Sequence, residues 1–462
     1  MNLAPPELEK MISGTPELQN AYFVGGCVRD WLLGLAVKDF DVEVFGVTYE
    51  ELVKALSRWG RIDLVGRSFG VVKLATQEGQ CYDFTIPRKD SKIAPGHKGF
   101  EIAFEPDISR EEAAARRDFT INAIMYDPRR REILDFFDGA VDLRNKLLRH
   151  TSPAFVEDPL RALRGMQFAG RFNLHAAPET AALCREIKSG YSELAVERVR
   201  EEWFKWAGRS AVPSAGLRFL IDTGWIDHFP EIKTLIDAPQ EPAWHPEGDV
   251  FTHTGHCCDA LARLPEWLNA DAQSRIVYML AILAHDFGKP ETTRRELKDG
   301  AMRIVSPGHE EAGARLAEQF LTHINAPLAV KERVVPLVAN HLFSFHDLTD
   351  HAIRRLARRL EPETIDGLCL IMTADSMGRP PRPPKIPDAV TRLLAKAHEL
   401  QVRQSAPRPI LQGRHLIERG MIPGPAFGKT LNAAYEAQLE GLIQDLPSAL
   451  DWLSKMMYTL NG

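Results

Sequence analysis

The hydrophobic pattern of this chain changes near residue 150, and that change limits the folds the chain can adopt. Between about residues 21 and 142, short apolar runs such as YFVGG, GVVKLA and EILDFF alternate with amphipathic stretches such as TYEELVKALSRWG. This alternation is typical of a mixed α/β domain, whereas the apolar residues after residue 152 follow helical spacing. We therefore predict the α+β fold class, with one sheet-containing domain followed by helical domains.

The length of the chain and two breaks in its pattern predict several domains. A chain of 462 residues is too long for one ordinary hydrophobic core. A polar, Pro-bearing stretch covers residues 237–249, and RPPRPPKIP interrupts the helical pattern at residues 379–387. We expect domains at residues 18–145, 146–236, 237–378 and 379–462.

The composition indicates a cytoplasmic globular protein with reduced thiols. Hydrophobic residues make up 44% of the chain and charged residues 26%; no apolar run approaches membrane-spanning length, and the first residues lack a basic-then-apolar leader. The six cysteines include no C-x-x-C pair, which argues against a zinc ribbon or a disulfide framework. The net charge of −6 argues against non-specific coating of nucleic acid but allows a local basic surface.

Carboxylates gather on one face of a predicted strand. In VKDFDVEV, residues 37–44, the apolar positions face one way and Asp39, Asp41 and Glu43 face the other. Carboxylates two residues apart on a strand lie about 7 Å from each other and repel unless a cation or solvent screens them. A solvated strand face is one interpretation, and a pair of metal-binding aspartates is the other. Asp83, in the later run CYDFTI, is a candidate third carboxylate.

The stretch before this strand favours the metal interpretation. GGCVRD, residues 25–30, places two glycines between an apolar run and an amphipathic helix, so that backbone N–H groups can approach a triphosphate closely. Alone this signal is weak. Together with the D-x-D pattern it predicts a site in which Asp39 and Asp41 hold two Mg²⁺ ions while the turn, with Gly26 and Arg29, binds the phosphates.

Two arginines open a further motif, RRDFTINAI at residues 116–124. They could be solvated residues ahead of a capped helix. Alternatively, Arg116 and Arg117 could bind phosphates while Asp118 or Asn122 binds the sugar. The motif by itself leaves both interpretations open.

The motif EDPLRALR, residues 157–164, carries an acceptor and two donors at helical spacing. Asp158 and Arg161 are three residues apart and would be neighbours on one helix face, with Arg164 one turn further. They could form an ordinary surface ion pair, which contributes little to stability. They could instead read a base, because C and A both present an amino donor beside a ring-nitrogen acceptor, whereas U and G would leave charges unpaired. The pair would then select CTP and ATP.

Taken in order, GGCVRD with DFD, RRDFTINA, DGAVDL, EDPLRALR and VERVREE resemble the motifs of bacterial class II tRNA nucleotidyltransferases, the CCA-adding enzymes. The resemblance covers about residues 20–235. It implies a polymerase-β-like head with Asp39 and Asp41 as Mg²⁺ ligands, a helical neck with the base-selecting pair, and a helical body that grips tRNA. Glu43 falls outside the family's metal pair, so we expect it to support the ligands or to be solvated. The nucleotide-binding residues implied are Gly26, Arg29, Arg116, Arg117, Asp118, Asn122, Asp158, Arg161 and Arg164.

Two relatives of these enzymes are alternatives. Bacterial poly(A) polymerases share the head but typically carry two basic residues after a strand glycine, where this chain has Arg67 followed by Ser68. Enzymes that add only CC lack a mobile loop before the RRD motif, whereas residues 87–113 here are polar and Gly- and Pro-bearing, as such a loop would be. Complete CCA addition to tRNA is therefore the predicted function.

A second group of motifs lies in the helical part. FTHTGHCCDAL, AILAHDFGKPETT and IMTADSMGR supply His253, the adjacent pair His285 and Asp286, and Asp375. The pair could be a buried His–Asp hydrogen bond. Two desolvated polar side chains in an apolar helix need further partners, however, and this favours a metal site.

This set resembles the metal-dependent HD phosphohydrolases, in which the pattern H…HD…D binds one divalent ion. His309 and His341 match the positions that complete a second metal in larger HD proteins. Imidazole ligands suit Ni²⁺, Mn²⁺ or Co²⁺ better than Mg²⁺, with Asp286 bridging or orienting. Some CCA-adding enzymes carry such a domain after the neck. It implies phosphatase, 2′-nucleotidase and 2′,3′-cyclic phosphodiesterase activities, used to trim damaged tRNA ends before repair.

An alternative from another class is an HD phosphohydrolase whose head is a non-catalytic RNA-binding platform. The intact Asp39, Asp41, Asp158 and Arg161 argue against it. The tail GRHLIERGMIPGPAFGKTL, residues 413–431, resembles an RNA-contacting appendix without an assigned chemical role. The single histidines receive no role either; they include His97, His175 and His415.

Overall fold

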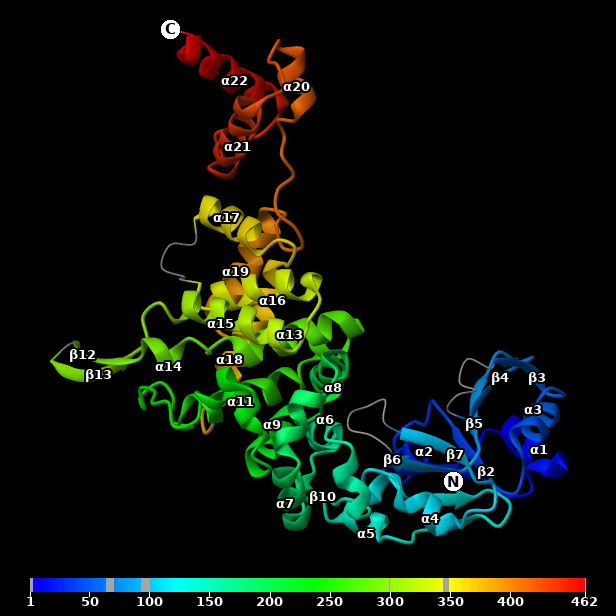
Figure 1. The fold of residues 1–462 in the computed structure, drawn as a ribbon. Helices are drawn as coiled ribbons and strands as arrows, with labels where there is room; N and C mark the ends of the chain where they lie inside the picture. The colour runs from blue at the N-terminus through cyan, green and yellow to red at the C-terminus, as the bar shows by residue number, and fades with distance from the viewer. Residues whose placement is uncertain (1–2, 64–69, 93–99, 299, 344–348, 462) are drawn as a thin grey trace. The chain divides into compact units, whose positions relative to one another are not determined.

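The chain forms two compact units, residues 1–228 and 229–462, and each is described by itself (Figure 1). None of the described helices is long and apolar enough to cross a membrane. The domain boundaries expected from the sequence remain predictions. The computed structural model describes residues 3–63, 70–92, 100–298, 300–343 and 349–461.

A seven-stranded sheet is the centre of the first unit. Its strand order is β3-β4-β5-β2-β1-β8-β9. Strands β2 and β5 pair in parallel, whereas β1 pairs antiparallel with both of its neighbours. The strands are β1 (Ala21–Val24), β2 (Asp41–Val44), β3 (Gly60–Asp63), β4 (Val71–Thr76), β5 (Cys81–Thr85), β8 (Met125–Asp127) and β9 (Glu132–Leu134).

Both faces of this sheet are covered by helices. Phe23 of β1 packs in a core with α1 and α3, while its neighbours Tyr22 and Val24 pack on the other face with α4. Tyr22 pairs with Glu43 in the sheet register, so Glu43 and Asp41 share the α4 side. The helices of this part are α1 (Pro6–Gly14), α2 (Gly26–Leu32), α3 (Tyr49–Leu56), α4 (Arg110–Ala115) and α5 (Gly139–Arg144).

The stretch 87–113 is more regular than the loop expected from the sequence. It contains the antiparallel strands β6 (Arg88–Lys92) and β7 (Phe100–Phe104), and α4 begins near its end. Much of the stretch that was predicted to be an irregular loop is therefore a pair of hydrogen-bonded strands. Residues 93–99 lie outside the described residues, as do Arg67 and Ser68, the pair used for comparison with poly(A) polymerases.

Three helices form the core of the rest of the first unit. α6 (Leu160–Phe172) packs against α8 (Val196–Arg209) and α9 (Pro213–Asp222), with the indoles of Trp203 and Trp206 fully buried. The remaining elements are η4 (Pro153–Glu157), β10 (Leu147–Leu148), β11 (His175–Ala176), α7 (Pro178–Glu186), η5 (Lys188–Glu193) and η6 (Trp225–His228).

Helices dominate the second unit. α11 (Val250–Leu261), α13 (Ala272–Ala284), α15 (His309–His323), α16 (Leu328–Asn340) and α18 (Ile365–Met377) form a connected bundle, with short helices α10 (Pro230–Lys233), α12 (Pro265–Leu268) and α14 (Lys289–Thr292). The expectation of an all-helical HD domain is wrong in one place. β12 (Arg294–Lys298) and β13 (Ala301–Val305) form an antiparallel hairpin that projects from the helices (Figure 1). The α+β fold class of the whole chain is confirmed.

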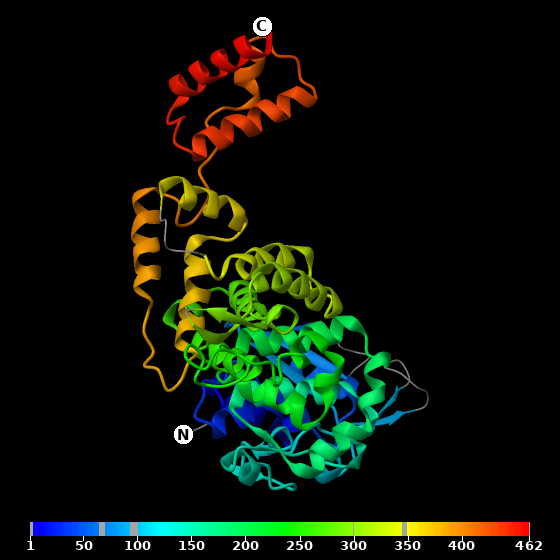
Figure 2. The ribbon, with the colours of Figure 1, turned by 90° about the vertical axis from the view of Figure 1, so that its left-hand side faces the viewer.

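The helical body continues beyond the break at residues 379–387. α19 (Asp388–Glu399) packs against α17 (Asp350–Leu360) and α18. The last helices, α20 (Gly413–Glu418), α21 (Pro425–Leu439) and α22 (Leu446–Asn461), gather around a small core of their own that includes Leu416 and Leu453 (Figure 2).

A glycine permits the close contact of α6 with α9, and this contact can be tested. A Cβ on Gly165 would overlap Cζ of the buried Phe219 ring, so the ring or the two helices would have to move. We expect Gly165→Ala to lower the free energy of unfolding of the first unit by about 1–3 kcal/mol in urea denaturation. Gly428→Ala in α21, where an added Cβ meets nothing within 4 Å, is the matched control and should be neutral or mildly stabilising. Equal stability of the two variants would contradict this packing.

Candidate active sites

The head of the first unit brings three carboxylates together. Asp41 begins β2 and pairs in register with Asp83 of the parallel strand β5. The sequence predicted Asp39 within the same strand, but Asp39 lies just before β2. Lys73 Nζ lies 3.0 Å from Asp83 Oδ2. Burial raises the pKa of Asp41 even though its tip reaches solvent, and Asp83 and Asp39 raise it further against the effect of Arg117. A hard divalent cation such as Mg²⁺ prefers such oxygen ligands and would relieve their repulsion.

The glycine turn lies beside these carboxylates. Gly25 has φ +71°, in the left-handed region that favours glycine. A Cβ there would stand 2.9 Å from Nη1 of Arg117 and 3.9 Å from Oδ2 of Asp41. The turn, an arginine and a metal-ligand candidate therefore meet at one place, with Gly26 starting α2 directly after it.

Glu43 holds the two arginines of the RRD motif. Its side chain is fully buried, so the expectation that it could be solvated is wrong. Arg116 Nη2 donates to Glu43 Oε1 at 3.2 Å, and Arg117 Nη2 donates to Oε2 at 3.4 Å. Both arginines follow the last residues of α4, which covers this face of the sheet. Glu43 thus fixes their position next to Asp41.

Asp118 joins the head to the neck helix α6. Its Oδ2 accepts from Arg164 Nε at 2.8 Å, and its Oδ1 accepts from Asn122 Nδ2 at 2.9 Å. Burial alone would raise the pKa of Asp118, but Arg164 and the donor groups around it lower the pKa below its ordinary value. Asn122 in turn accepts from Arg29 Nη1 at 2.5 Å. Arg29 is buried, with its guanidinium 4.4 Å from the ring centre of Phe172.

The EDPLRALR motif is arranged differently from the helical pair predicted. Helix α6 begins at Leu160, after Pro159, so Asp158 precedes the helix, and its Oδ1 accepts from the Leu160 N–H at 3.1 Å. Asp158 Oδ2 pairs with Arg198 Nη2 of α8 at 2.9 Å. Arg161 donates to the backbone carbonyls of Ala154 and Arg116 at 2.9 and 3.1 Å. The alternative of an ion pair between Asp158 and Arg161 is therefore wrong, because each side chain has other partners, and Arg198 is a site candidate that the sequence reasoning missed.

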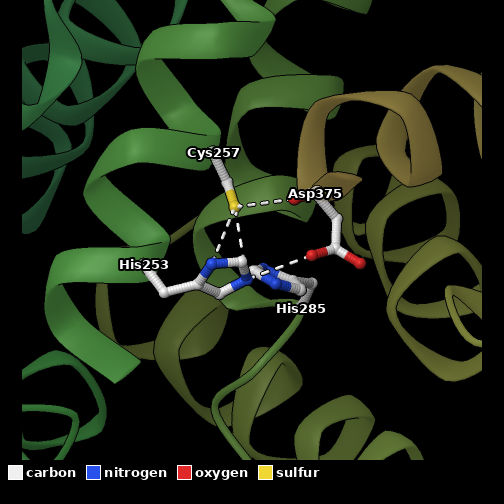
Figure 3. A group of neighbouring side chains, drawn as sticks. All are labelled: His253, Cys257, His285 and Asp375. Carbon is white, nitrogen blue, oxygen red and sulfur yellow. Dashed lines mark hydrogen bonds and ion pairs between the residues drawn. The ribbon is translucent and has the colours of Figure 1, made fainter. Parts of the chain in front are cut away.

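In the second unit, the ends and faces of five helices converge on one buried cluster. His253 projects from α11 and Asp375 from α18, and the two meet with His253 Nε2 3.0 Å from Asp375 Oδ1 (Figure 3). His285 caps the end of α13 and Asp286 follows it. His309 opens α15 and His341 caps α16; all six side chains are buried.

Asp286 stands between two sets of imidazoles. Its Oδ2 lies 3.1 Å from His285 Nε2 and 3.6 Å from His253 Nε2. Its Oδ1 lies 3.4 Å from His309 Nε2 and 3.8 Å from His341 Nε2. The structure thus brings the H…HD…D residues and the two additional histidines together around one carboxylate. Burial alone would raise the pKa of Asp286, but His285 and Lys289 hold it well below its ordinary value.

The ring nitrogens of this cluster are oriented for metal binding. The Nδ1 atoms of His285, His309 and His341 contact the carbonyls of Ile282, Ser306 and Val338 at 2.7, 2.6 and 2.7 Å. Their buried Nε2 atoms have no well-aligned hydrogen-bond partner among the described residues. Donation from Nδ1 to a carbonyl leaves the Nε2 lone pair for an ion, and burial lowers the pKa of His341 to about 3, which keeps that ring neutral. These residues fit a divalent transition metal better than Mg²⁺.

Two further residues support His253. Glu247 Oε1 lies 2.7 Å from its Nδ1, an arrangement in which a carboxylate fixes the tautomer of a metal ligand. Cys257 Sγ lies 3.4 and 3.7 Å from the two ring nitrogens of His253, over the imidazole (Figure 3). Burial raises the pKa of the Cys257 thiol. Neither residue was predicted, although Glu247 lies in the polar, Pro-bearing stretch 237–249 and Cys257 lies in the motif FTHTGHCCDAL.

A cavity of about 280 Å³ opens beside the cluster. Asp286, His309, His341 and Asp375 reach it from the cluster, together with two cations that the sequence analysis did not assign, Lys289 and Arg379. Lys289 Nζ lies 2.7 Å from Asp286 Oδ2, and Arg379 Nη2 donates to both oxygens of Asp375 at 2.8 and 2.9 Å. The cavity can therefore receive an anionic group next to the metal-ligand candidates.

Two known families match separate parts of the chain. Residues 21–149 match the poly A polymerase head domain, and residues 250–379 match the HD domain. The first match contains the carboxylates and the RRD motif, and the second contains the buried cluster from His253 to Asp375.

Curated relatives match most of the chain. The multifunctional CCA protein of Xanthomonas campestris pv. campestris is 35% identical over 370 residues, which cover 78% of this chain and 85% of that protein. The multifunctional CCA protein of Nitrosococcus oceani is 36% identical over 368 residues, covering 78% of this chain and 84% of that protein.

Solved structures share the fold at lower identity. The Bacillus stearothermophilus CCA-adding enzyme in complex with CTP aligns with a TM-score of 0.65 and 20% identity over 99% of each chain. The Thermotoga maritima CCA-adding enzyme complexed with tRNA_CCA aligns with a TM-score of 0.56 and 17% identity, over 98% of this chain and 96% of that one. These alignments show a common fold.

The imidazole cluster predicts tight binding of a transition metal. After removal of metal with a chelator and dialysis against Ni²⁺, we expect the full chain to retain the ion and His285→Ala to retain much less, as measured by atomic emission. His256→Ala changes a histidine of the same helix as His253 but outside the cluster, so it should retain as much as the unchanged chain. Equal Ni²⁺ content in all three proteins would contradict the assignment of the cluster.

Proposed function

The chain belongs to the family of multifunctional CCA proteins, and we propose that its two units carry two chemistries. The first unit adds CCA to the 3′ end of tRNA from CTP and ATP without a nucleic-acid template. The second hydrolyses phosphoesters with a metal ion. The observation that carries the first assignment is the meeting of Asp41, Asp83, Arg117 and the Gly25 turn at one place in the head. A cytoplasmic location, where these substrates occur, is part of the proposal.

In the head, Asp39 and Asp41 would hold Mg²⁺, with Asp83 beside them. Mg²⁺, when bound, stabilises the charge on the attacking 3′-oxygen and on the leaving pyrophosphate. The chain itself positions the triphosphate. Arg116 and Arg117 contribute positive charge, and their hydrogen bonds to Glu43 fix the orientation of both guanidinium groups. The left-handed turn at Gly25 keeps a side chain out of the space between Arg117 and Asp41.

Base selection is assigned to Asp158 and Arg161. Arg198 holds one oxygen of Asp158, and two carbonyl groups hold the guanidinium of Arg161, so each side chain is fixed by its own partners. A fixed acceptor and a fixed donor can match the edges of C and A without rearranging for each base. Asp118, Asn122 and Arg164 link the head to the helix that carries Arg161 and are assigned to nucleotide positioning, as is Arg29.

In the second unit, His253, His285, Asp286 and Asp375 would hold a divalent ion, and His309 and His341 would complete a second site with Asp286. Such an ion, Ni²⁺, Mn²⁺ or Co²⁺, would supply Lewis acidity that activates water for attack on a phosphoester. Lys289 and Arg379 place positive charge at the same cavity, where they would attract the phosphate. The predicted substrates are 2′,3′-cyclic phosphates, 2′-nucleotides and other phosphomonoesters, consistent with trimming of damaged RNA ends.

Poly(A) addition is the second candidate for the head, because the matching head domain is described for poly A polymerases. The relatives that match most of the chain favour CCA addition. A non-catalytic head is the third candidate. The length of the product separates all three.

Product length also tests the metal ligands. With tRNA that ends before CCA and labelled nucleotides, we expect the unchanged chain to add three residues. Asp41→Ala should add none, because loss of a ligand removes the ion that stabilises the leaving pyrophosphate, while its hydrolysis of 2′,3′-cyclic AMP is retained. His285→Ala should show the reverse pattern. A long A tail, or near-normal addition by Asp41→Ala, would overturn the assignment.

Nucleotide preference tests the base-reading residues. Asp158→Ala removes the acceptor for the amino group of C and A, so we expect kcat/KM for CTP and ATP to fall about tenfold or more, with relatively better use of UTP or GTP. Arg198→Ala should shift the preference in the same direction because it frees Asp158. Glu197→Ala, at the exposed neighbouring position of α8, is the control. Unchanged ratios among the four nucleotides in Asp158→Ala would mean that this residue does not read the base.

A further inference from the structure

Trp244 stands exposed beside the metal cluster of the second unit. Its side chain is 61% exposed, although a large aromatic group gains most when a partner or ligand covers it. It lines the same cavity of about 280 Å³ as Asp286, His309 and Lys289. An aromatic surface and the candidate metal cluster thus border one space.

The groups around this cavity suit the parts of a nucleotide. Lys289 and Arg379 provide positive charge, and Nε of Arg379 is buried without a hydrogen-bond partner among the residues that the structure describes. Ile304 and Leu342 provide apolar surface in addition to Trp244. A volume of about 280 Å³ is at the lower end for ligand sites, so it accommodates a phosphate and a sugar, while a base would remain at the exposed edge.

The indole of Trp244 is held from one side. The guanidinium of Arg382 lies 5.7 Å from the ring centre, and Arg382 Nη2 also donates to the carbonyl of Ala243. The guanidinium of Arg382 thus covers part of the indole, and the remaining exposed surface of Trp244 is open to another planar group. Nucleobases stack on such aromatic surfaces whatever their sequence, because every base has a π-face.

We propose that Trp244 binds the nucleobase of the substrate in the hydrolytic site. The site then favours a phosphate on the ribose of a nucleotide over a small phosphoester without a base, while both share the contacts to the phosphate. This proposal rests on the hydrolytic function proposed above for the second unit. It assigns to Trp244 a role in specificity that is separate from metal binding, since the indole offers no ligand atom to the cluster.

Two cyclic phosphates that differ in the base provide the test. 2′,3′-Cyclic AMP and glycerol 1,2-cyclic phosphate share the five-membered phosphodiester ring, but only the first carries a base. We expect Trp244→Ala to lower kcat/KM for 2′,3′-cyclic AMP about tenfold, mainly through KM, and to leave the glycerol compound unaffected. Trp244→Phe should keep most of the activity. Leu297→Ala on β12, an apolar position that is 72% exposed and outside the cavity, should affect neither substrate.

Loss of both activities in parallel, or loss of neither, would overturn the proposal. A second measurement does not depend on turnover. Irradiation of the metal-stripped chain with 8-azidoadenosine 2′,3′-cyclic phosphate should label residues adjoining Trp244, and Trp244→Ala should lose this label. Labelling elsewhere, or none at saturating probe, contradicts base binding. If the unchanged chain hydrolyses neither cyclic phosphate, the proposed hydrolytic function fails, and the labelling still decides the role of Trp244.

Discussion

A buried carboxylate is unstable in a protein unless cations or hydrogen-bond donors surround it, and each unit of this chain is arranged around one such group. In the first unit Asp118 takes Arg164 and Asn122 as partners and thereby fixes helix α6 against the head. In the second unit Asp286 takes Lys289 and faces four imidazoles. The first carboxylate is satisfied by the protein. The second is surrounded by imidazoles of which three, those of His285, His309 and His341, have Nε2 atoms without a well-aligned hydrogen-bond partner in the described part of the chain, and this is the physical basis for proposing a metal there.

The two candidate sites place their ligands on different kinds of scaffold. In the head, Asp41 and Asp83 are neighbours because β2 and β5 are parallel and in register, so the sheet itself sets their separation. In the second unit the ligands sit near helix ends, where a histidine can donate Nδ1 to a carbonyl of its own last turn, as His285 and His341 do. In both units, regular backbone carries the candidate ligand side chains of Asp41, Asp83, His285 and His341, and this would lower the ordering cost of binding an ion.

The sequence was most informative where chemistry depends on neighbouring residues. The D-x-D pattern, the His-Asp pair and the change to helical spacing are local signals, and the family resemblance and fold class drawn from them are confirmed. Interactions with residues far away in the sequence could not be predicted from it. The spacing of Asp158 and Arg161 suggested one helix face, but Pro159 delays the helix and Arg198, forty residues away, takes the carboxylate. The burial of Glu43 likewise follows from α4 covering the sheet, which periodicity within one strand does not reveal.

We propose that one chain both repairs and completes the end of a tRNA. To test this, the protein is supplied with tRNA that ends before CCA in a 2′,3′-cyclic phosphate, together with CTP, ATP, Mg²⁺ and Ni²⁺, and the length of the product is followed. We expect the unchanged chain to remove the phosphate and then to add three nucleotides, whereas Asp286→Asn should extend only tRNA with a free 3′ end. If the unchanged chain extends the free tRNA but not the blocked one, the second unit does not repair the end that the first unit completes.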